Sequence, residues 1–401
     1  MFCPVPSPTP RSTVDERRPD AEAVERKMSF RPSAYWYMTT RCNLQCRHCS
    51  VQSSPFSDVS HELDTQQALV AVERIRELNP SMLIISGGEP LVRSDFCTIF
   101  EALIEAGVNS GIETNGLLFT PALLELLHRA DRKGLYQGMT ISLDGGNAEA
   151  HEWMRGPKTF GRTLENMRLL TERGITFDVQ CVLHRANVGT LPSLFREMAG
   201  LKPRCLILTF LLPIGRGLQM IQDVGIDAES IKRACQIIAN EKDTYRGTVN
   251  VKFPPAAIPP DYIVRLFGGN NRCDCTVSCR FPPIAILPNG NITICQVTRD
   301  DPNFQYGNVT ISSLVEIWKK AKLDELRNTY LQVKLSGICS DCIFARTCRG
   351  SCRAFAFEEF GDFTAPHPLC DALDHRGEFP AAYRLSSMSR KSVKRGRAHR
   401  A

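Results

Sequence analysis

Three cysteines are closely spaced in the pattern Cys42-x3-Cys46-x2-Cys49, directly after an apolar segment that predicts a β-strand. A loop that follows a strand of a parallel sheet lies at the carboxyl end of that sheet, where α/β active sites are found. Three thiolates from one loop can bind three irons of a four-iron, four-sulfur cluster and leave the fourth iron open to a cofactor or substrate. The spacing alone also permits a zinc site made with His48. The loop therefore predicts a metal centre at the mouth of an α/β sheet.

Short apolar segments alternate with longer amphipathic ones after the first strand. This alternation predicts parallel βαβ units with right-handed crossovers. Six repeats are too few for a closed eight-stranded barrel, so we expect an α/β fold with a partial, TIM-like (β/α)6 barrel. The predicted strands are 34–39, 82–86, 110–113, 139–143, 177–183 and 206–211. The predicted helices are 67–78, 95–106, 121–129, 163–173 and 190–199.

Composition divides the chain into four predicted parts. Residues 1–33 are rich in proline and charge and are predicted to form a disordered leader, followed by the barrel core at 34–250. Residues 251–380 are rich in proline, glycine and cysteine, which suits a small domain built around metal sites. Within that domain an Asn-Gly pair predicts a β-hairpin over 284–294. Residues 381–401 are predicted to be a basic disordered tail.

The net charge of +6 comes from the last sixteen residues, which hold six basic residues and no acid. The rest of the chain is neutral, so we expect no nucleic-acid partner for the folded part. No apolar segment reaches the roughly 18 to 20 residues of a membrane span, and the N-terminus lacks the order of a secretory signal. We therefore expect no membrane partner and a cytoplasmic location. Seventeen cysteines in such a reducing compartment indicate metal ligands rather than disulfides.

Two glycine-containing segments follow the next predicted strands. Gly87-Gly88-Glu89 ends the second strand, where two glycines let a ligand approach the backbone and Glu89 can accept a hydrogen bond from an ammonium group. Asn115 lies in a Thr-Asn-Gly segment after the third strand, although Asn-Gly is also an ordinary turn. Both segments lie at the same sheet edge as the cysteine loop.

The cysteine triad and the Gly-Gly-Glu segment together resemble the radical S-adenosylmethionine (SAM) superfamily over about residues 34–215. In that family the open iron chelates the methionine part of SAM, and one electron cleaves the cofactor to a 5'-deoxyadenosyl radical. The resemblance implies that Cys42, Cys46 and Cys49 hold the catalytic cluster. It also implies cofactor contacts by Gly87, Gly88, Glu89, Asn115, Ser142, Asp144 and Arg155.

Three of these cofactor contacts follow the fourth predicted strand. The resemblance assigns Ser142, Asp144 and Arg155 to the methionine carboxylate and the ribose, and the arginine fork suits a carboxylate. The alternative is that each is a surface cap or part of a loop salt bridge. By the same resemblance, residues 213–216 after the sixth strand would flank the adenine.

The remaining clustered cysteines resemble the SPASM extension of the superfamily, whose members bind two auxiliary four-iron clusters. With the catalytic cluster, the resemblance implies three [4Fe-4S] clusters. The first auxiliary set is Cys273, Cys279, Cys295 and Cys352, and the second is Cys339, Cys342, Cys348 and Cys370. Four ligands per cluster favour electron transfer or structural support, and two zinc sites are the alternative. Cys275 is either a spare ligand or a hydrogen-atom donor.

The SPASM extension most often accompanies enzymes that modify ribosomally made peptides, so the resemblance implies a peptide substrate and a flavodoxin- or ferredoxin-type reductant. About 33 residues precede the first strand, so we expect any leader-peptide recognition protein to be separate. Gln296 occupies the position at which sulfatase-maturing relatives have an Asp that acts as a base. Because glutamine cannot act as a base, this residue argues against that activity. The alternatives are an enzyme acting on a small molecule, an aminosugar or a tetrapyrrole, and a non-catalytic electron-transfer protein.

Overall fold

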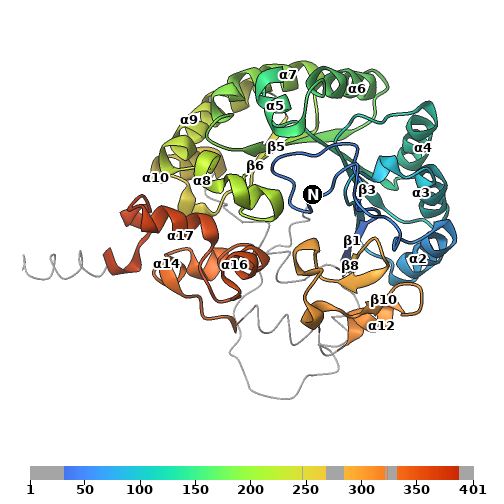
Figure 1. Ribbon diagram of the computed structural model, residues 1–401. Coiled ribbons are helices and arrows are strands. Elements are labelled where there is room, and N and C mark those ends of the chain that lie inside the picture. Colours follow the sequence, from blue (N-terminus) through green and yellow to red (C-terminus); the bar gives the residue numbers. More distant parts are fainter. Residues whose placement is uncertain (1–30, 246, 268–283, 321–322, 324–331, 388–401) are drawn as a thin grey trace, which may run out of the picture. The chain divides into compact units, whose positions relative to one another are not determined.

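Ten strands form one sheet in a computed structural model that describes residues 31–245, 247–267, 284–320, 323 and 332–387. Seven strands of the core are β1 Ser33–Tyr37, β2 Met82–Ser86, β3 Ser110–Thr114, β4 Tyr136–Ser142, β5 Phe177–Leu183, β6 Cys205–Phe210 and β7 Thr248–Val251. Three further strands are β8 Ile284–Ile286, β9 Asn291–Thr293 and β10 Gly307–Asn308. Their order is β10-β9-β8-β1-β2-β3-β4-β5-β6-β7, with all neighbours from β8 to β7 parallel (Figure 1).

Helices connect the core strands and lie around the outside of the curved sheet (Figure 1). In the core they are α2 Thr65–Leu78, α3 Phe96–Glu105, α4 Pro121–Arg132, α5 Ala148–Arg155, α6 Phe160–Glu172, α7 Leu191–Leu201, α8 Ile221–Val224, α9 Ala228–Tyr245 and α10 Pro260–Phe267. The C-terminal helices are α12 Leu314–Lys319, α14 Gly337–Ser340, α15 Ala345–Cys348, α16 Arg353–Phe360 and α17 Pro368–His375. Within the described ranges, no helix combines the length and the apolar character needed to cross a membrane.

The predicted partial barrel is confirmed, and its strands and helices end within three residues of the predicted positions. The structure adds β7, which pairs in parallel with β6 and continues the sheet beyond the six predicted strands. The prediction missed this strand because it has only four residues and its side chains are largely polar or partly exposed. It also missed α5, α8, α9 and α10.

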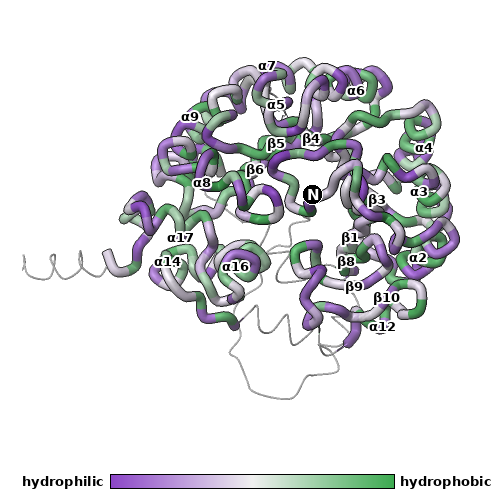
Figure 2. The backbone as a smooth tube through the Cα atoms, in the orientation of Figure 1, coloured by the Kyte–Doolittle hydropathy of each residue, from purple (hydrophilic) through white to green (hydrophobic). Residues whose placement is uncertain are grey.

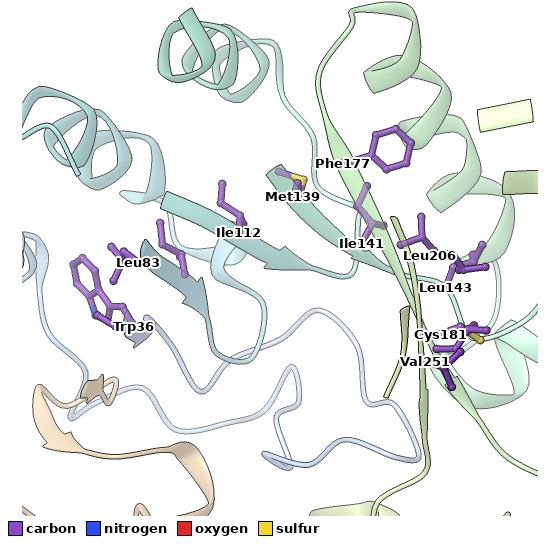
Figure 3. Packing of buried hydrophobic residues seen from close by; sticks show 14 of the residues in the cluster. Trp36, Leu83, Ile112, Met139, Ile141, Leu143, Phe177, Cys181, Leu206 and Val251 are labelled. Carbon is purple, nitrogen blue, oxygen red and sulfur yellow. The ribbon is translucent and has the colours of Figure 1, made fainter. Parts of the chain in front are cut away.

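The hydrophobic core lies between the strands and the surrounding helices. Alternate residues of each strand point outward to the helices, as Trp36, Leu83, Ile112 and Met139 do in Figure 3. Hydrophobic and hydrophilic positions alternate along the helices (Figure 2). The hydrophobic positions pack into this layer. The other residues of each strand therefore face the inside of the barrel. Ser86, whose hydrogen bond is described below, is one of them.

Capping residues set where several helices begin. Asp64 accepts a hydrogen bond from the backbone N–H of Gln67, and the side chain of Gln67 accepts one from the N–H of Asp64. This capping box begins α2 two residues before the predicted start. Asn147 likewise caps α5 by accepting a hydrogen bond from the N–H of Ala150 at 2.9 Å.

The C-terminal region is joined to the barrel through its hairpin. The predicted hairpin over 284–294 is confirmed, since β8 and β9 pair antiparallel. β8 also pairs in parallel with β1, so that Tyr35 lies opposite Ala285. The strand that leads into the cysteine loop is therefore flanked on one side by β2 and on the other by the C-terminal region.

The predicted tail begins later than expected. Tyr383 is buried and donates a hydrogen bond from its hydroxyl to the carbonyl of Ile258 at 2.9 Å. Arg384 pairs with Asp374, and the side chain of Ser386 donates to Asp341. Residues 381–387 are thus packed on the folded unit because an aromatic side chain and an ion pair hold them. The predicted leader to residue 30 and the tail from residue 388 lie outside the described residues.

Candidate active site

The loop with Cys42, Cys46 and Cys49 follows β1 at the carboxyl end of the parallel strands. Arg216 holds this loop, because its side chain donates to the carbonyl of Cys46 at 2.7 Å and to that of Ser53 at 2.8 Å. The backbone N–H of Arg216 donates to the carbonyl of Cys49 at 3.0 Å. The segment 213–216, expected to flank the adenine, thus fastens the cysteine loop.

Gly87 and Gly88 pack against the backbone that leads into the cysteine loop. A Cβ atom on Gly88 would lie 2.2 Å from the carbonyl oxygen of Arg41, and one on Gly87 would lie 2.6 Å from that of Thr39. Gly87 also has a φ of +136°, a conformation that favours glycine. The two glycines are therefore needed for close contact with the protein's own backbone, a role that the sequence analysis did not predict.

Glu89 joins the end of β2 to the segment after β3. Its Oε1 accepts hydrogen bonds from the hydroxyl of Thr114 at 2.8 Å and the N–H of Leu91 at 3.1 Å, and its Oε2 accepts from the N–H of Asn115 at 2.7 Å. Burial raises the pKa of Glu89 to about 7, while these hydrogen bonds act to lower it. A carboxylate has about four acceptor positions, and this one gives three of them to the protein.

Asn115 connects this segment with the cysteine loop. Its Nδ2 donates to Oδ1 of Asn43 at 2.8 Å and lies 3.8 Å from Sγ of Cys42. Burial raises the pKa of the Cys42 thiol to about 12, although a hydrogen bond from the N–H of Leu44 opposes this effect. The triad, the Gly-Gly-Glu segment and Asn115, which were predicted separately, therefore form one connected network through Glu89.

Asp144 is the centre of a second network. Its Oδ2 accepts from Nε of Arg155 at 2.6 Å and lies 3.0 Å from Nε2 of His48, and its Oδ1 accepts from the N–H of Val182 at 2.8 Å. Burial acts to raise the pKa of Asp144, but Arg155 and His48 hold it well below the usual range. Asp144 is fully buried, so it is not a surface cap, and the ion pair with Arg155 is the salt bridge that the alternative allowed.

Arg155 brings this network to a cysteine. Its Nη1 lies 4.0 Å from Sγ of Cys46. Burial raises the pKa of the Cys46 thiol, and the charge of Arg155 lowers it. Arg155 is therefore positioned to stabilise a thiolate. Ser142, the last residue of β4, lies half-buried on the inner side of the sheet, opposite Gln180 of β5.

The missed helix α5 contributes further residues to this region. Nδ1 of His151 accepts a hydrogen bond from the N–H of Asp144 at 3.1 Å. The ring of Trp153 lies 4.7 Å from the guanidinium carbon of Arg47, which belongs to the cysteine loop, and 5.4 Å from the ring of His184. The cap at Asn147 was the signal in the sequence that could have revealed this helix.

Acidic and phenolic groups lie on the inner face of the barrel, and sequence reasoning did not find them. The hydroxyl of Ser86 donates to Oε2 of Glu113 at 2.7 Å, and burial raises the pKa of Glu113. Burial also raises the pKa of Tyr37, as do Tyr35, Cys295 and Glu113, while a backbone hydrogen bond from Gln296 acts to lower it. Tyr37 therefore links the barrel interior electrostatically to a predicted auxiliary-cluster ligand.

The structure brings together the four cysteines predicted for the second auxiliary cluster. One cavity is lined by Cys339, Cys342, Cys348 and Cys370, together with His367. Burial and the three other thiols raise the pKa of Cys370 well above its usual value. Iron would displace the thiol protons and relieve this mutual repulsion, so the donor set fits a cluster.

The first auxiliary set is described only in part. Cys295 directly precedes the short helix Gln296–Thr298, Cys352 directly precedes α16, and these two elements pack together. Cys273, Cys279 and the neighbouring Cys275 lie outside the described residues.

Across the described ranges, no three His, Cys, Asp or Glu side chains are close enough together to hold a single metal ion. This finding does not contradict a cluster, because each thiolate of a four-iron cluster binds a different iron.

A parallel partial barrel with three cysteines at its mouth and a cysteine-lined C-terminal region defines the class of iron–sulfur enzymes that act on SAM. Residues 36–197 match the family model of the Radical SAM superfamily, and residues 275–343 match SPASM, the iron–sulfur cluster-binding domain. The chain is a radical SAM enzyme with a SPASM domain. The expectation of an enzyme is confirmed, and the non-catalytic alternative is excluded.

Two relatives show similarity over most of the chain. The AdoMet-dependent heme synthase of Methanosarcina barkeri is 28% identical over 84% of this chain and 95% of its own length. The mycofactocin maturase MftC of Mycolicibacterium smegmatis is 28% identical over 87% of this chain and 85% of its own length.

Solved structures share the fold. SuiB of Streptococcus suis bound to S-adenosylmethionine has a TM-score of 0.65 at 15% identity and covers 87% of this chain and 80% of its own. The enzyme anSMEcpe with bound AdoMet and a peptide has a TM-score of 0.64 at 18% identity, over 86% and 95% of the two chains. These similarities support the α/β fold predicted from the sequence.

Proposed function

We propose that this chain cleaves SAM reductively to a 5'-deoxyadenosyl radical and abstracts a hydrogen atom from a ribosomally synthesised peptide. Cys42, Cys46 and Cys49 would hold the catalytic cluster, which supplies the electron and an open iron for the cofactor. Two auxiliary clusters, held by the two cysteine sets named above, would bring the number to three. The protein's own residues bind and orient SAM and keep water from the radical.

The observation that carries the proposal is the pair of networks that meet at the cysteine loop. One runs from Glu89 through Asn115 to Cys42, and the other runs from Asp144 through Arg155 to Cys46. A purely structural metal site does not require two buried carboxylates whose hydrogen bonds connect the ends of three strands to the loop that carries the ligands. An enzyme that must place a cofactor beside an open iron does need that rigidity.

The residues assigned to SAM have different tasks in this proposal. Gly87 and Gly88 bring the end of β2 against the cysteine loop, and Glu89 holds the segment that presents Asn115. Ser142 and Arg155 would contact the cofactor at the inner edge of β4 and α5, with the arginine fork suited to a carboxylate. Asp144 would orient Arg155 through their ion pair.

A peptide substrate is supported by one relative and by the inner face of the barrel. The relative MftC is a maturase by name, and SuiB shares the fold in a structure with its precursor peptide. Glu113 adds a half-buried carboxyl group on the inner face, which accepts a hydrogen bond from Ser86. Amide and hydroxyl groups of a peptide can donate hydrogen bonds to such a group.

A tetrapyrrole substrate is the second candidate. The heme synthase of M. barkeri matches this chain over 95% of its own length, which favours this candidate. A porphyrin carries carboxylates, and although burial raises the pKa of Glu113, this group would repel them wherever it is ionised. The two candidates therefore differ in the group that Glu113 has to meet.

A low-potential reductant of the flavodoxin or ferredoxin type would supply the electron. Thiolates kept as iron ligands need a reducing compartment, so we place the reaction in the cytosol.

Anaerobic reconstitution followed by reduction with dithionite tests the proposal. Three clusters predict about twelve irons and twelve sulfides per chain, and SAM should yield 5'-deoxyadenosine and methionine. Cys42→Ala should abolish cleavage, whereas the control Cys97→Ala, on α3 in the outer layer, should not. Incubation with peptides encoded beside the gene, and separately with an iron porphyrin, should give a mass change only with a peptide. A product from the porphyrin alone would favour the second candidate, and no cleavage of SAM at all would refute both.

A further inference from the structure

His367 lies in the cavity formed by the four C-terminal cysteines. The residue is 1% exposed, and its ring is one of the groups that line the cavity. Its backbone N–H lies 3.3 Å from Sγ of Cys339, for which it is a donor. Only two residues separate it from Cys370 along the chain. His367 is therefore held at the cysteine site by its own backbone as well as by its ring.

The ring nitrogens of His367 have different partners. Nδ1 accepts a hydrogen bond from the N–H of Leu369 at 3.2 Å, because His367 is the N-cap of α17. A ring nitrogen that accepts carries a lone pair, so the proton of the ring is on Nε2. Nε2 is buried and has no hydrogen-bond partner in the part of the chain that the structure describes. A buried N–H donor without an acceptor costs free energy, which points to a partner that occupies the cavity.

The surroundings keep the ring in this position. The rings of Phe210 and Phe355 pack edge-on against it at 5.8 and 6.3 Å. The segment before His367 is anchored by Arg353, whose side chain donates to the carbonyls of Phe363 and Ala365. Nε2 thus cannot reach solvent by a simple rotation of the ring.

We propose that His367 donates a hydrogen bond from Nε2 to a sulfur of the group held by Cys339, Cys342, Cys348 and Cys370. The inference rests on the proposed function, in which these cysteines hold an auxiliary [4Fe-4S] cluster. A hydrogen bond to a cluster sulfur stabilises the reduced, more negative state more than the oxidised state. His367 is therefore a positioning residue that raises the reduction potential of this cluster.

Ligation of iron by His367 fits the geometry less well. A ligating Nε2 has to give up its proton, and the proton would move to Nδ1. Nδ1–H would then face the N–H of Leu369, so two donors would oppose each other at 3.2 Å. Four cysteines already supply four ligands.

The substitution His367→Asn tests the role of Nε2. Asparagine is a preferred N-cap, so its side chain can still accept from the N–H of Leu369, while the Nε2 donor is lost. The matched control is His375→Asn at the exposed other end of α17. In an EPR-monitored redox titration we expect a lower midpoint potential for one auxiliary cluster in His367→Asn and no shift in the control.

Pulsed EPR on the wild-type holoenzyme provides a measurement that needs no variant. With histidine labelled with ¹⁵N only at the ring nitrogens, and with exchange into D₂O, the reduced cluster should show a weak ring-¹⁵N coupling, to which the backbone N–H of His367 cannot contribute. A strong coupling typical of a ligated nitrogen, or an unshifted potential in a His367→Asn protein with full iron content, would overturn the proposal. Zinc in place of iron at these cysteines would instead refute the cluster on which it rests.

Discussion

Nε of Arg155 lies 2.6 Å from Oδ2 of Asp144 in a largely buried ion pair, and Nη1 of the same guanidinium lies 4.0 Å from Sγ of Cys46. The pair joins the end of β4, the helix α5 and the cysteine loop. A buried ion pair adds little net stability compared with apolar residues, but losing one partner leaves the other charge stranded. The pair is therefore a device for orientation, and it defines the first prediction.

Asp144→Asn should destabilise the protein by about 3 to 5 kcal/mol, because Arg155 would remain buried without its counter-ion. Denaturant unfolding of the protein measures this loss. The variant should also retain less iron at the triad and bind SAM more weakly, since Arg155 would no longer be directed to Cys46.

Asp178→Asn is the matched control for this change. Asp178 is also buried and pairs with Arg204, whose Nε lies 2.9 Å from its Oδ1, near the amino end of β5. This variant should lose stability yet bind SAM like the wild type. Equal SAM affinity in both variants would contradict the orienting role of Asp144.

Glu89 predicts a pH dependence of stability in the absence of SAM. Burial raises its pKa from the reference value of 4.5 to about 7 in the folded protein. Between these two pH values the folded state holds a proton that the unfolded state has released. The free energy of unfolding should therefore be highest below pH 4.5 and fall by about 3 kcal/mol as the pH rises through 7.

The variant Glu89→Gln isolates this effect. A neutral amide does not titrate, so the difference in unfolding free energy between wild type and variant should change with pH in the stated direction. Urea titrations at pH 5, 6, 7 and 8 provide the measurement. A difference that stays constant over this range would show that Glu89 is not perturbed.

Gly88→Ala should abolish cluster assembly. The new Cβ would lie 2.2 Å from the carbonyl oxygen of Arg41, a backbone atom that cannot move without shifting the cysteine loop. Gly161→Ala is the control, because Gly161 lies in α6 with no atom within 4 Å of the new Cβ. That change should be neutral or stabilising by up to about 1 kcal/mol. Iron content and thermal unfolding distinguish the two, and a fully loaded Gly88→Ala protein would contradict the prediction.

Truncation tests the packed start of the predicted tail. Removing residues 381–401 should cost at least about 3 kcal/mol more than removing 388–401, because only the longer deletion takes away the buried ring of Tyr383. The longer deletion also removes the partner of Asp374. Equal unfolding temperatures of the two truncated proteins would show that Tyr383 contributes nothing to the fold.

Prediction from the sequence succeeded where the signal is local. It identified β2 and β5 to the residue, because most residues of these two strands are buried and both form short, largely apolar segments. It failed for α5, whose eight residues bury only His151 and Met154 and so carry little periodicity. It also failed for β7, for the same reason of length.

The candidate site divides in the same way. The cysteine sets could be proposed because iron ligation restricts both residue type and spacing, and four of these cysteines do line one cavity. The sequence gives no such signal for the partners of Glu113 and His367, since a single carboxylate or histidine can have many different partners in a folded protein.

The sequence by itself determined the class of chemistry. A loop of three thiolates, a strand–helix repeat and a second group of cysteines are enough to identify that class, because each consists of adjacent or regularly spaced residues. Only the tertiary structure decided what the polar groups do. It showed that Asp144 pairs with Arg155 in the interior and that Glu89 connects the ends of two strands. Hydrogen bonds act over tenths of an ångström between residues that are tens of positions apart, so their partners depend on strand order and register.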